Sequence, residues 1–224
     1  IALDFDADVE PISLYREGGS ITERHLMYAL AKKLTEKYGR GEALIRAMPT
    51  LGVTLSAKQL AQLADTTYPF YEYDLLGILK SAFIEKIYVP ATEECITIAQ
   101  AAAFAKENGA IACYAYLGDV AQSVTGDKKA QKFEDAYLDQ LFDVLDDCGI
   151  RAVTYMPTRN TPQQLDRLRS LCEKHHMFQV SGEDINSPRQ SFVIHAMENP
   201  QFANLIASTW QLIDHENGVR RIEL

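Results

Sequence analysis

The stretch 178–190 (FQVSGEDINSPRQ) brings together residue types that could bind a metal ion and a phosphate. An apolar run is followed at once by Glu183 and Asp184, and then by Asn186 and Arg189. Carboxylate oxygens bind divalent cations, and an arginine guanidinium binds anions such as phosphate. Strands that end in this way in α/β proteins place polar side chains at the carboxyl edge of a sheet or barrel, where ligands bind. An ordinary polar loop between a strand and a helix is the alternative.

Two earlier apolar runs end in the same way. The run 110–116 leads into Tyr116 and Asp119, and the run 150–156 leads into Arg159. The carboxyl ends of parallel strands lie on one edge of a sheet, so residues that are far apart in the sequence converge there. Two arginines among several carboxylates suit a phosphorylated or otherwise anionic substrate that is held beside a divalent metal. Salt bridges between these arginines and carboxylates, with a purely structural role, are the alternative.

Helices are expected to alternate with these strands and to hold them in place, with the third strand at 177–181. One helix is expected to begin after Thr92 and to end at Asn108. The next is expected to end at Cys148, with Phe133, Tyr137, Leu141 and Val144 on one face. A third helix is expected to begin after Thr161, with Pro162 and Gln164 in its first turn and with Leu165, Leu168 and Leu171 at helical spacing. The last is expected to begin after Asn199 and carries Leu205, Ile206, Thr209 and Ile213. Continuous apolar strands that alternate with helices predict an α/β fold with a parallel sheet covered by helices. Three repeats are too few for a closed barrel, so about half of one would be missing.

The earlier part of the chain has a different pattern. Residues 1–19 are expected to form a linker or a short strand, 20–87 a helical subdomain, and 88–224 the strand-containing region. Ser20 and Glu23 predict a capping box at the start of the first long helix. Aromatic side chains crowd one connection of this subdomain: Tyr68, Phe70, Tyr71 and Tyr73. Such a cluster is typical of a small helical core, and a stacking platform for a base is the alternative.

The composition argues against several other classes of protein. The 224 residues carry a formal net charge of -9, which argues against nucleic-acid binding through clustered Lys and Arg. No run approaches the roughly 20 apolar residues of a membrane span, and no signal pattern is found. The four cysteines lie far apart in apolar contexts, so we expect buried thiols of a cytoplasmic protein. The sequence lacks the motifs HxH, HExxH, GxSxG, GxxxxGK and GxGxxG.

At the strand ends the sequence resembles the PHP (polymerase and histidinol phosphatase) family, whose members are metal-dependent phosphoesterases built on a distorted, seven-stranded β/α barrel. The resemblance covers residues 20–189, more than two-thirds of the chain. GGSITERHLMYAL resembles the opening of a helical insertion that many members carry. FIEKIYVPATEECITIAQAAAFAKENGAIACYAYLGD resembles the segment that leads to the family's strand ending in His-Pro. GIRAVTYMPTRNTPQQLDRLRSLCEKHHMFQVSGEDINSPR resembles the stretch that ends in its Gly-Ser-Asp-x-His-Gly.

The resemblance implies a set of metal ligands, residue by residue. Asp184 matches the family's ligating aspartate, whereas Tyr116 and Asn186 stand where the family has ligating histidines. Glu183 replaces the family's usual Ser, and as a hard oxygen ligand it would favour Mg or Mn over Zn. The family's remaining ligands would precede Ile1. Tyrosine and asparagine are weak metal ligands, so the family's trinuclear centre is not expected to form in its usual way.

Two hypotheses follow from the resemblance. In the first, the chain is the carboxyl-terminal part of a phosphoesterase that hydrolyses a small phosphorylated substrate with Mn, Mg, Zn or Fe. Its catalytic residues would be Asp184 and Glu183, its metal ligands these two with Asn186, and its substrate-binding residues Arg189, Arg159, Tyr116 and Asp119. In the second, the barrel has lost catalysis and binds a ligand or a protein partner. In either case the open sheet edge would be covered by another copy or by the rest of the barrel.

Overall fold

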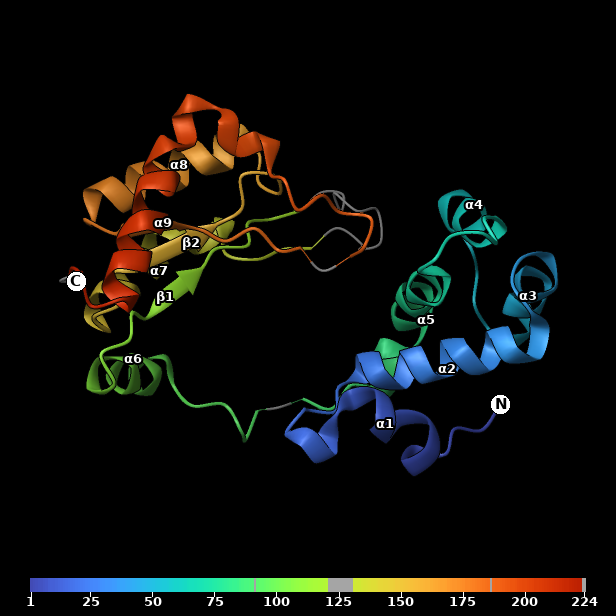
Figure 1. Cartoon of the computed structure of the whole chain (residues 1–224). Helices are drawn as coiled ribbons and strands as arrows, with labels where there is room; N and C mark the ends of the chain where they lie inside the picture. Colours follow the sequence, from blue (N-terminus) through green and yellow to red (C-terminus); the bar gives the residue numbers. More distant parts are fainter. Residues whose placement is uncertain (91, 121–130, 186, 223–224) are drawn as a thin grey trace. The chain divides into compact units, whose positions relative to one another are not determined.

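The computed structural model describes residues 1–90, 92–120, 131–185 and 187–222, so the expected metal ligand Asn186 lies outside the described residues. The chain divides into two compact units, Ile1–Pro90 and Ala91–Leu224 (Figure 1). No helix among the described residues is long and apolar enough to cross a membrane.

The first unit consists of helices. They are α1 (Glu10–Ser13), α2 (Glu23–Tyr38), α3 (Glu42–Ala47), α4 (Ala57–Ala64) and α5 (Tyr71–Ile87), with short helical turns at Phe5–Val9, Tyr15–Glu17 and Met48–Leu51. Its core lies between the two long helices, α2 and α5, where Met27 and Leu34 pack with Leu75 and Leu79. Burial of such a stripe stabilises each helix more than its intrinsic propensity does.

The expectation of a linker or short strand over residues 1–19 is wrong. Oδ1 of Asp4 accepts a hydrogen bond of 2.8 Å from the backbone N–H of Ala7 and caps the helical turn that follows. Asp8 forms a 2.9 Å ion pair with Lys33 of α2. Asp4 therefore caps a turn, and Asp8 attaches this turn to the helical unit.

The start of α2 also differs from the expected capping box of Ser20 and Glu23. The N-cap is Thr22, and its backbone N–H donates to Nδ1 of His25 over 3.0 Å. Glu23 instead forms an ion pair of 2.6 Å with Lys80 of α5. The helix therefore begins two residues later than Ser20 suggests, and Glu23 links α2 to α5.

Within the aromatic cluster, Tyr71 is a core residue. It is fully buried, and its hydroxyl accepts from Gly41 N and donates to Leu63 O, both at 3.0 Å. The guanidinium of Arg40 lies over its ring at 5.1 Å and forms a bidentate ion pair with Glu72. Tyr71 belongs to the buried cluster of the helical unit, as the core interpretation predicts.

The second unit contains the predicted parallel sheet. Its strands are β1 (Cys113–Ala115), β2 (Ala152–Tyr155) and β3 (Phe178–Ser181), in the order β1-β2-β3. Its helices are α6 (Ile98–Glu107), α7 (Leu138–Asp147), α8 (Pro162–Lys174) and α9 (Ala203–Glu216), with single 3-10 turns at Asp135–Tyr137, His195–Glu198 and Pro200–Phe202. Neighbouring strands pair in parallel, with Tyr114 opposite Val153 and Val153 opposite Gln179. The α/β class with a small parallel sheet is thus confirmed, although three strands do not make a full barrel.

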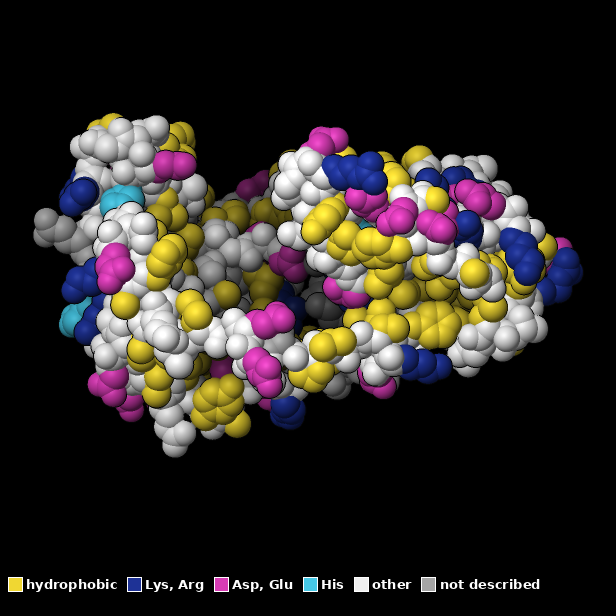
Figure 2. Space-filling view, turned by 90° about the horizontal axis from the view of Figure 1, so that it is seen from below, with side chains coloured by type: hydrophobic (Ala, Val, Ile, Leu, Met, Phe, Trp, Pro, Cys, Tyr) yellow, Lys and Arg dark blue, Asp and Glu magenta, His cyan; other side chains and the backbone are white. Residues whose placement is uncertain are grey.

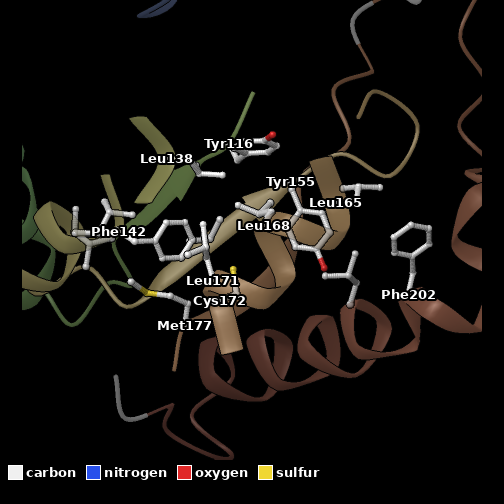
Figure 3. Packing of buried hydrophobic residues seen from close by; sticks show 14 of the residues in the cluster. Tyr116, Leu138, Phe142, Tyr155, Leu165, Leu168, Leu171, Cys172, Met177 and Phe202 are labelled. Carbon is white, nitrogen blue, oxygen red and sulfur yellow. The ribbon is translucent and has the colours of Figure 1, made fainter. Parts of the chain in front are cut away.

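The helices of this unit pack on one face of the sheet. Side chains alternate between the faces of a strand, and Tyr116, Val153 and Tyr155 point to the same side. They form one core with buried residues of α7, α8 and α9 (Figure 3): Leu138, Phe142, Leu145, Leu165, Leu168, Leu171, Cys172 and Leu205. On the opposite face, Cys113 and Ala115 are exposed. The described residues therefore leave one face of the sheet partly uncovered.

The packing of two helices corrects the sequence interpretation. In α7 the buried residues are Leu138, Phe142 and Leu145, whereas Tyr137 and Val144, which were expected on the inner face, are exposed. Both stripes have helical spacing, and the packing against the sheet buries the stripe of Leu138, Phe142 and Leu145. The first helix of this unit, α6, begins after Thr97 and not after Thr92, because the side chain of Thr97 caps the N–H of Gln100.

Two of the four cysteines are not buried as expected. None of the four forms a disulfide, and Cys172 is buried in the core, whereas Cys95 and Cys113 are exposed. Cys95 precedes the first turn of α6, and Cys113 lies on the uncovered face of the sheet. Cys95 is exposed because α6 starts later than expected, and Cys113 is exposed because its side of the sheet is uncovered.

Candidate functional site at the carboxyl edge of the sheet

The end of β1 is fixed by an aspartate that the sequence interpretation missed. The hydroxyl of Tyr116 donates to Oδ1 of Asp135 over 2.6 Å, and Oδ2 of the same carboxylate accepts from the backbone N–H of Asp119 over 2.9 Å. Tyr116 itself is 1% exposed. The expected substrate ligand Tyr116 is therefore a buried structural residue whose hydroxyl is already engaged.

Glu134, the residue before Asp135, holds the same strand end. It is 2% exposed, and its Oε1 accepts from the backbone N–H of Leu117 over 2.8 Å and from the hydroxyl of Tyr114 over 3.2 Å. A buried carboxylate needs such partners to offset its desolvation. Glu134 and Asp135 thus bind two backbone N–H groups beyond β1, those of Leu117 and Asp119.

Asp119, an expected substrate-binding residue, has a structural role as well. Its Oδ1 accepts from the backbone N–H of Phe133 over 2.6 Å, and its Oδ2 forms an ion pair of 2.9 Å with Lys132. The next residue, Val120, exchanges two backbone hydrogen bonds of 2.9 Å with Gln131. Hydrogen bonds and one ion pair therefore join residues 119–120 to residues 131–133.

Gln164 connects these residues to helix α8. It completes the predicted capping box, because its Oε1 accepts from Thr161 N over 2.9 Å. Its Nε2 donates to Oδ2 of Asp135 over 2.7 Å and to Asp119 O over 2.8 Å. The sequence pattern predicted only the first of these functions.

Gly118 is required where these groups meet. Its φ is +69°, in the region that favours glycine, and a Cβ there would lie 2.7 Å from Nδ2 of Asn160 and 2.9 Å from the hydroxyl of Tyr116. A larger residue would displace the hydrogen-bonding side chains that surround this turn.

The expected anion-binding residue Arg159 lies at the end of β2, next to the end of β1. Its Nε donates to the backbone carbonyl of Leu117 over 3.1 Å, and its guanidinium carbon lies 5.6 Å from the centre of the Phe133 ring. Asn160 donates to the same carbonyl over 2.8 Å. The ends of β1 and β2 therefore converge as predicted, through Arg159 and Asn160.

The end of β3 joins them through Glu183. Its Oε1 accepts from the backbone N–H of Thr158 over 2.8 Å, and its Oε2 accepts from the Thr158 hydroxyl. One residue earlier, a Cβ at Gly182 would lie 2.0 Å from Oγ1 of Thr154, so the chain approaches β2 too closely for any side chain. The expected catalytic residue Glu183 thus links β3 to β2.

Asp184 and Arg189 lie further out in the loop that follows β3. Both are exposed, and the backbone carbonyl of Asp184 accepts from Nε2 of Gln190 over 2.9 Å. Asn186, between them, lies outside the described residues. Of the three expected metal ligands, only the Asp184 carboxylate is solvent-exposed in the part of the chain that the structure describes.

The hydrogen bonds at this edge set the protonation of its groups. Burial, together with the bond to Asp135, raises the pKa of Tyr116 far above its ordinary value. Burial alone would raise the pKa of Asp135, but the bonds from Tyr116, Gln164 and the Asp119 N–H lower it below the ordinary value. The bond from Lys132 is the main cause of a lowered pKa at Asp119. At neutral pH the tyrosine is therefore neutral and both aspartates are charged.

These residues do not fit a metal centre by themselves. Within the described ranges, no three side chains of His, Cys, Asp or Glu are grouped so that they could hold one ion. Tyr116 is a neutral donor to Asp135, and both oxygens of Glu183 accept from Thr158. A neutral phenol is a poor ligand for Mg, Mn or Zn. The geometry fits an edge that is held together by hydrogen bonds and that includes the guanidinium of Arg159.

Comparisons of this sequence with models of protein families, with curated proteins and with solved structures gave no match.

Proposed function

We propose that Ala91–Leu224 is part of a PHP-like β/α barrel whose carboxyl edge binds a small phosphorylated or otherwise anionic molecule without hydrolysing it. The order β1-β2-β3, with parallel pairing and with helices packed on one face, supports the barrel. Doubly wound sheets instead reverse their strand order and carry helices on both faces. Ligands of β/α barrels bind at the carboxyl edge of the strands.

The observation that carries the ligand-binding proposal is the state of Arg159. Its Nε is used by the Leu117 carbonyl, and no described residue pairs with its two terminal amino groups. Four N–H donors are thus left for an anion, and a guanidinium binds carboxylates and phosphates through two parallel hydrogen bonds. The nearby cations Lys132 and Arg167 are engaged with Asp119 and Asp139, respectively.

The engagement of Tyr116 and Glu183 favours binding over hydrolysis. Tyr116 stands where the family has a ligating histidine, and Glu183 is a carboxylate that was expected to hold the metal beside Asp184. Both serve as structural links between segments. Hydrolysis of this kind needs a metal to activate water and to neutralise the phosphoryl oxygens. The Arg159 guanidinium supplies positive charge for binding, but it does not activate water.

Calorimetric titration with inorganic phosphate and a panel of small phosphoesters tests the proposal. We expect Arg159→Ala to abolish binding, and the control Arg46→Ala, at an exposed arginine of α3, to bind as the unchanged protein does. Metal analysis and a hydrolysis assay on the same samples address the enzyme hypothesis. Hydrolysis together with bound Mn, Mg, Zn or Fe would support the phosphoesterase that the resemblance implies, and would overturn the non-catalytic function.

The surface of this unit supports a further part of the proposal, namely that additional structure covers the open side of the sheet. Only Ala102 of α6 is buried, whereas Phe104 is 66% exposed. On α9, Ile206, Trp210 and Ile213 form an exposed apolar stripe. Figure 2 shows exposed apolar side chains on each unit. Another copy or the rest of the barrel is the expected cover. Four cysteines without a disulfide suit the expected cytoplasmic location.

A further inference from the structure

The guanidinium of Arg159 is held from two sides by residues of other segments. The ring of Phe133, from the segment before α7, has its centre 5.6 Å from the guanidinium carbon. The Leu117 carbonyl, after β1, accepts a hydrogen bond of 3.1 Å from Nε. The peptide of Leu117 is itself fixed, because its N–H donates to the buried carboxylate of Glu134 over 2.8 Å. One aromatic ring and one fixed carbonyl therefore define both the position and the rotation of the guanidinium.

We propose that Phe133 and Glu134 are positioning residues that orient Arg159 so that its two terminal amino groups bind two oxygens of one phosphate end-on. The inference rests on the proposed function of this edge. An exposed arginine has many rotamers, and ordering it on binding reduces the affinity. Because the ring and the carbonyl order Arg159 beforehand, this loss is smaller for the anion that binds.

The two positioning residues act by different means. Phe133 supplies a ring face on which a guanidinium stacks favourably, and its own backbone N–H is held by Asp119 over 2.6 Å. Glu134 acts on Arg159 through the Leu117 peptide, because it fixes the N–H of this residue so that the carbonyl meets Nε of Arg159. Ring and carboxylate are adjacent in sequence, so one short segment provides both.

The charges around the site select a compact anion. Asp119, Glu134 and Asp135 surround the same strand end, and the two aspartates carry lowered pKa values. A long polyanion such as a nucleic acid would meet these carboxylates and be repelled, whereas a single phosphate group at Arg159 is small enough to avoid them. The ligand class is therefore a small molecule with one phosphate group at its end.

The test is calorimetric titration of the full chain with inorganic phosphate at constant ionic strength. Phe133→Leu removes the ring face, and we expect it to weaken phosphate binding about two- to fivefold, the range for an exposed cation–π contact. Phe133→Tyr keeps the ring face and should bind as tightly as the unchanged chain. Phe104→Leu, at an exposed phenylalanine of α6, is the matched control and should not change the affinity.

Glu134 is tested by the pair Glu134→Gln and Glu134→Ala. The amide oxygen of glutamine can still accept from Leu117 N, so Glu134→Gln should retain most of the affinity, while Glu134→Ala should lose it. The NMR signal of the Arg159 Nε–H reports the geometry directly, also in the unchanged chain. We expect this proton to exchange slowly with water without ligand, and more rapidly in Phe133→Leu and Glu134→Ala.

The outcomes separate the two proposals. If Arg159→Ala binds phosphate as tightly as the unchanged chain, the proposed function itself is wrong. If Arg159→Ala abolishes binding but Phe133→Leu matches Phe133→Tyr, the function stands and the positioning role is overturned. If a variant does not fold, the exchange measurement on the unchanged chain still tests the positioning role. Rapid exchange of the Arg159 Nε proton in that chain would overturn this role.

Discussion

The hydroxyl of Tyr116 donates a 2.6 Å hydrogen bond to Oδ1 of Asp135 and so ties the end of β1 to the segment that starts α7. The family resemblance places a metal ligand at Tyr116, but its oxygen faces a carboxylate that needs a proton donor. The hydroxyl of Tyr116 and the carboxylate of Asp135 are therefore hydrogen-bonded to each other inside the protein. The carboxyl edge is therefore organised around an anion, Asp135, that is internal to the fold.

Removing this hydroxyl should destabilise the second unit. In Tyr116→Phe the ring still fills its buried position, but Oδ1 of Asp135 loses its donor. A hydrogen bond to a charged group is worth about 1.5–3 kcal/mol, and we expect a loss in that range in urea unfolding. Tyr137→Phe, at a tyrosine that is 49% exposed, is the control and should change the stability by less than about 0.5 kcal/mol. Equal stability of both variants would contradict the structural role of the hydroxyl.

Stability should depend on Asp135 and Asp119 in acid. Each has a pKa below its ordinary value in the folded chain. In the unfolded chain the pKa of an aspartate is about 3.9. Their stabilisation is therefore fully present above that pH and is lost as the pH falls through the lower, folded-state pKa. Urea unfolding between pH 5 and about 2 should show this loss, with a shallower pH dependence in Asp135→Asn. Parallel curves for the two proteins would show that Asp135 is not responsible.

Gly182→Ala should disrupt the contact between β3 and β2. The added Cβ would lie 2.0 Å from Oγ1 of Thr154, and overpacking of this kind costs about 1–3 kcal/mol. Removing the hydroxyl as well, in the double variant with Thr154→Ala, should recover part of the loss, which a double-mutant cycle measures. Gly77→Ala in α5 is the matched control: no atom lies within 4 Å of its Cβ position, so it should stabilise the helix by about 0.5–1 kcal/mol.

In the first unit, Tyr71→Phe should cost about 1–3 kcal/mol. The change leaves the N–H of Gly41 and the carbonyl of Leu63 without the hydroxyl that each contacts at 3.0 Å in a buried position. Thermal unfolding followed by circular dichroism measures the effect. Tyr88→Phe, at a 66% exposed tyrosine, should leave the melting temperature unchanged. A similar melting temperature for both variants would mean that water replaces the Tyr71 hydroxyl.

Local signals in one continuous segment predicted the fold best. Helix α8 begins after Thr161 with Pro162 at its first position, and Leu165, Leu168 and Leu171 are buried as expected. Cap, proline and apolar spacing all lie within eleven residues, so tertiary contacts had little to decide. The strands around it were predicted equally well, because each is a continuous apolar run.

The face of α7 was predicted wrongly because two stripes compete there. Tyr137, Leu141 and Val144 have the same helical spacing as Leu138, Phe142 and Leu145, and only the packing against the sheet selects the second set. Phe133, which was assigned to the first stripe, lies before the helix and under Arg159. Periodicity alone does not distinguish such stripes.

The candidate site was predicted at its strand ends but not in the groups that hold them. Tyr116 was identified because it ends an apolar run, and Arg159 because it comes shortly after one. The structure brings both to the same edge. Glu134 and Asp135 were missed because their partners lie some way back along the chain. A signal did exist, since an adjacent Glu and Asp also occur at Glu183, where the pair was recognised.

Among the described residues, β1 is paired on one side only, by β2, and it presents Cys113 and Ala115 to solvent. A strand edge with unpaired backbone groups is a template for any extended peptide that meets it. Refolding of these 224 residues from denaturant should therefore depend on protein concentration, with soluble yield highest at strong dilution. Lysine in place of Ala115, which adds charge to that edge, should raise the concentration at which the chain begins to aggregate.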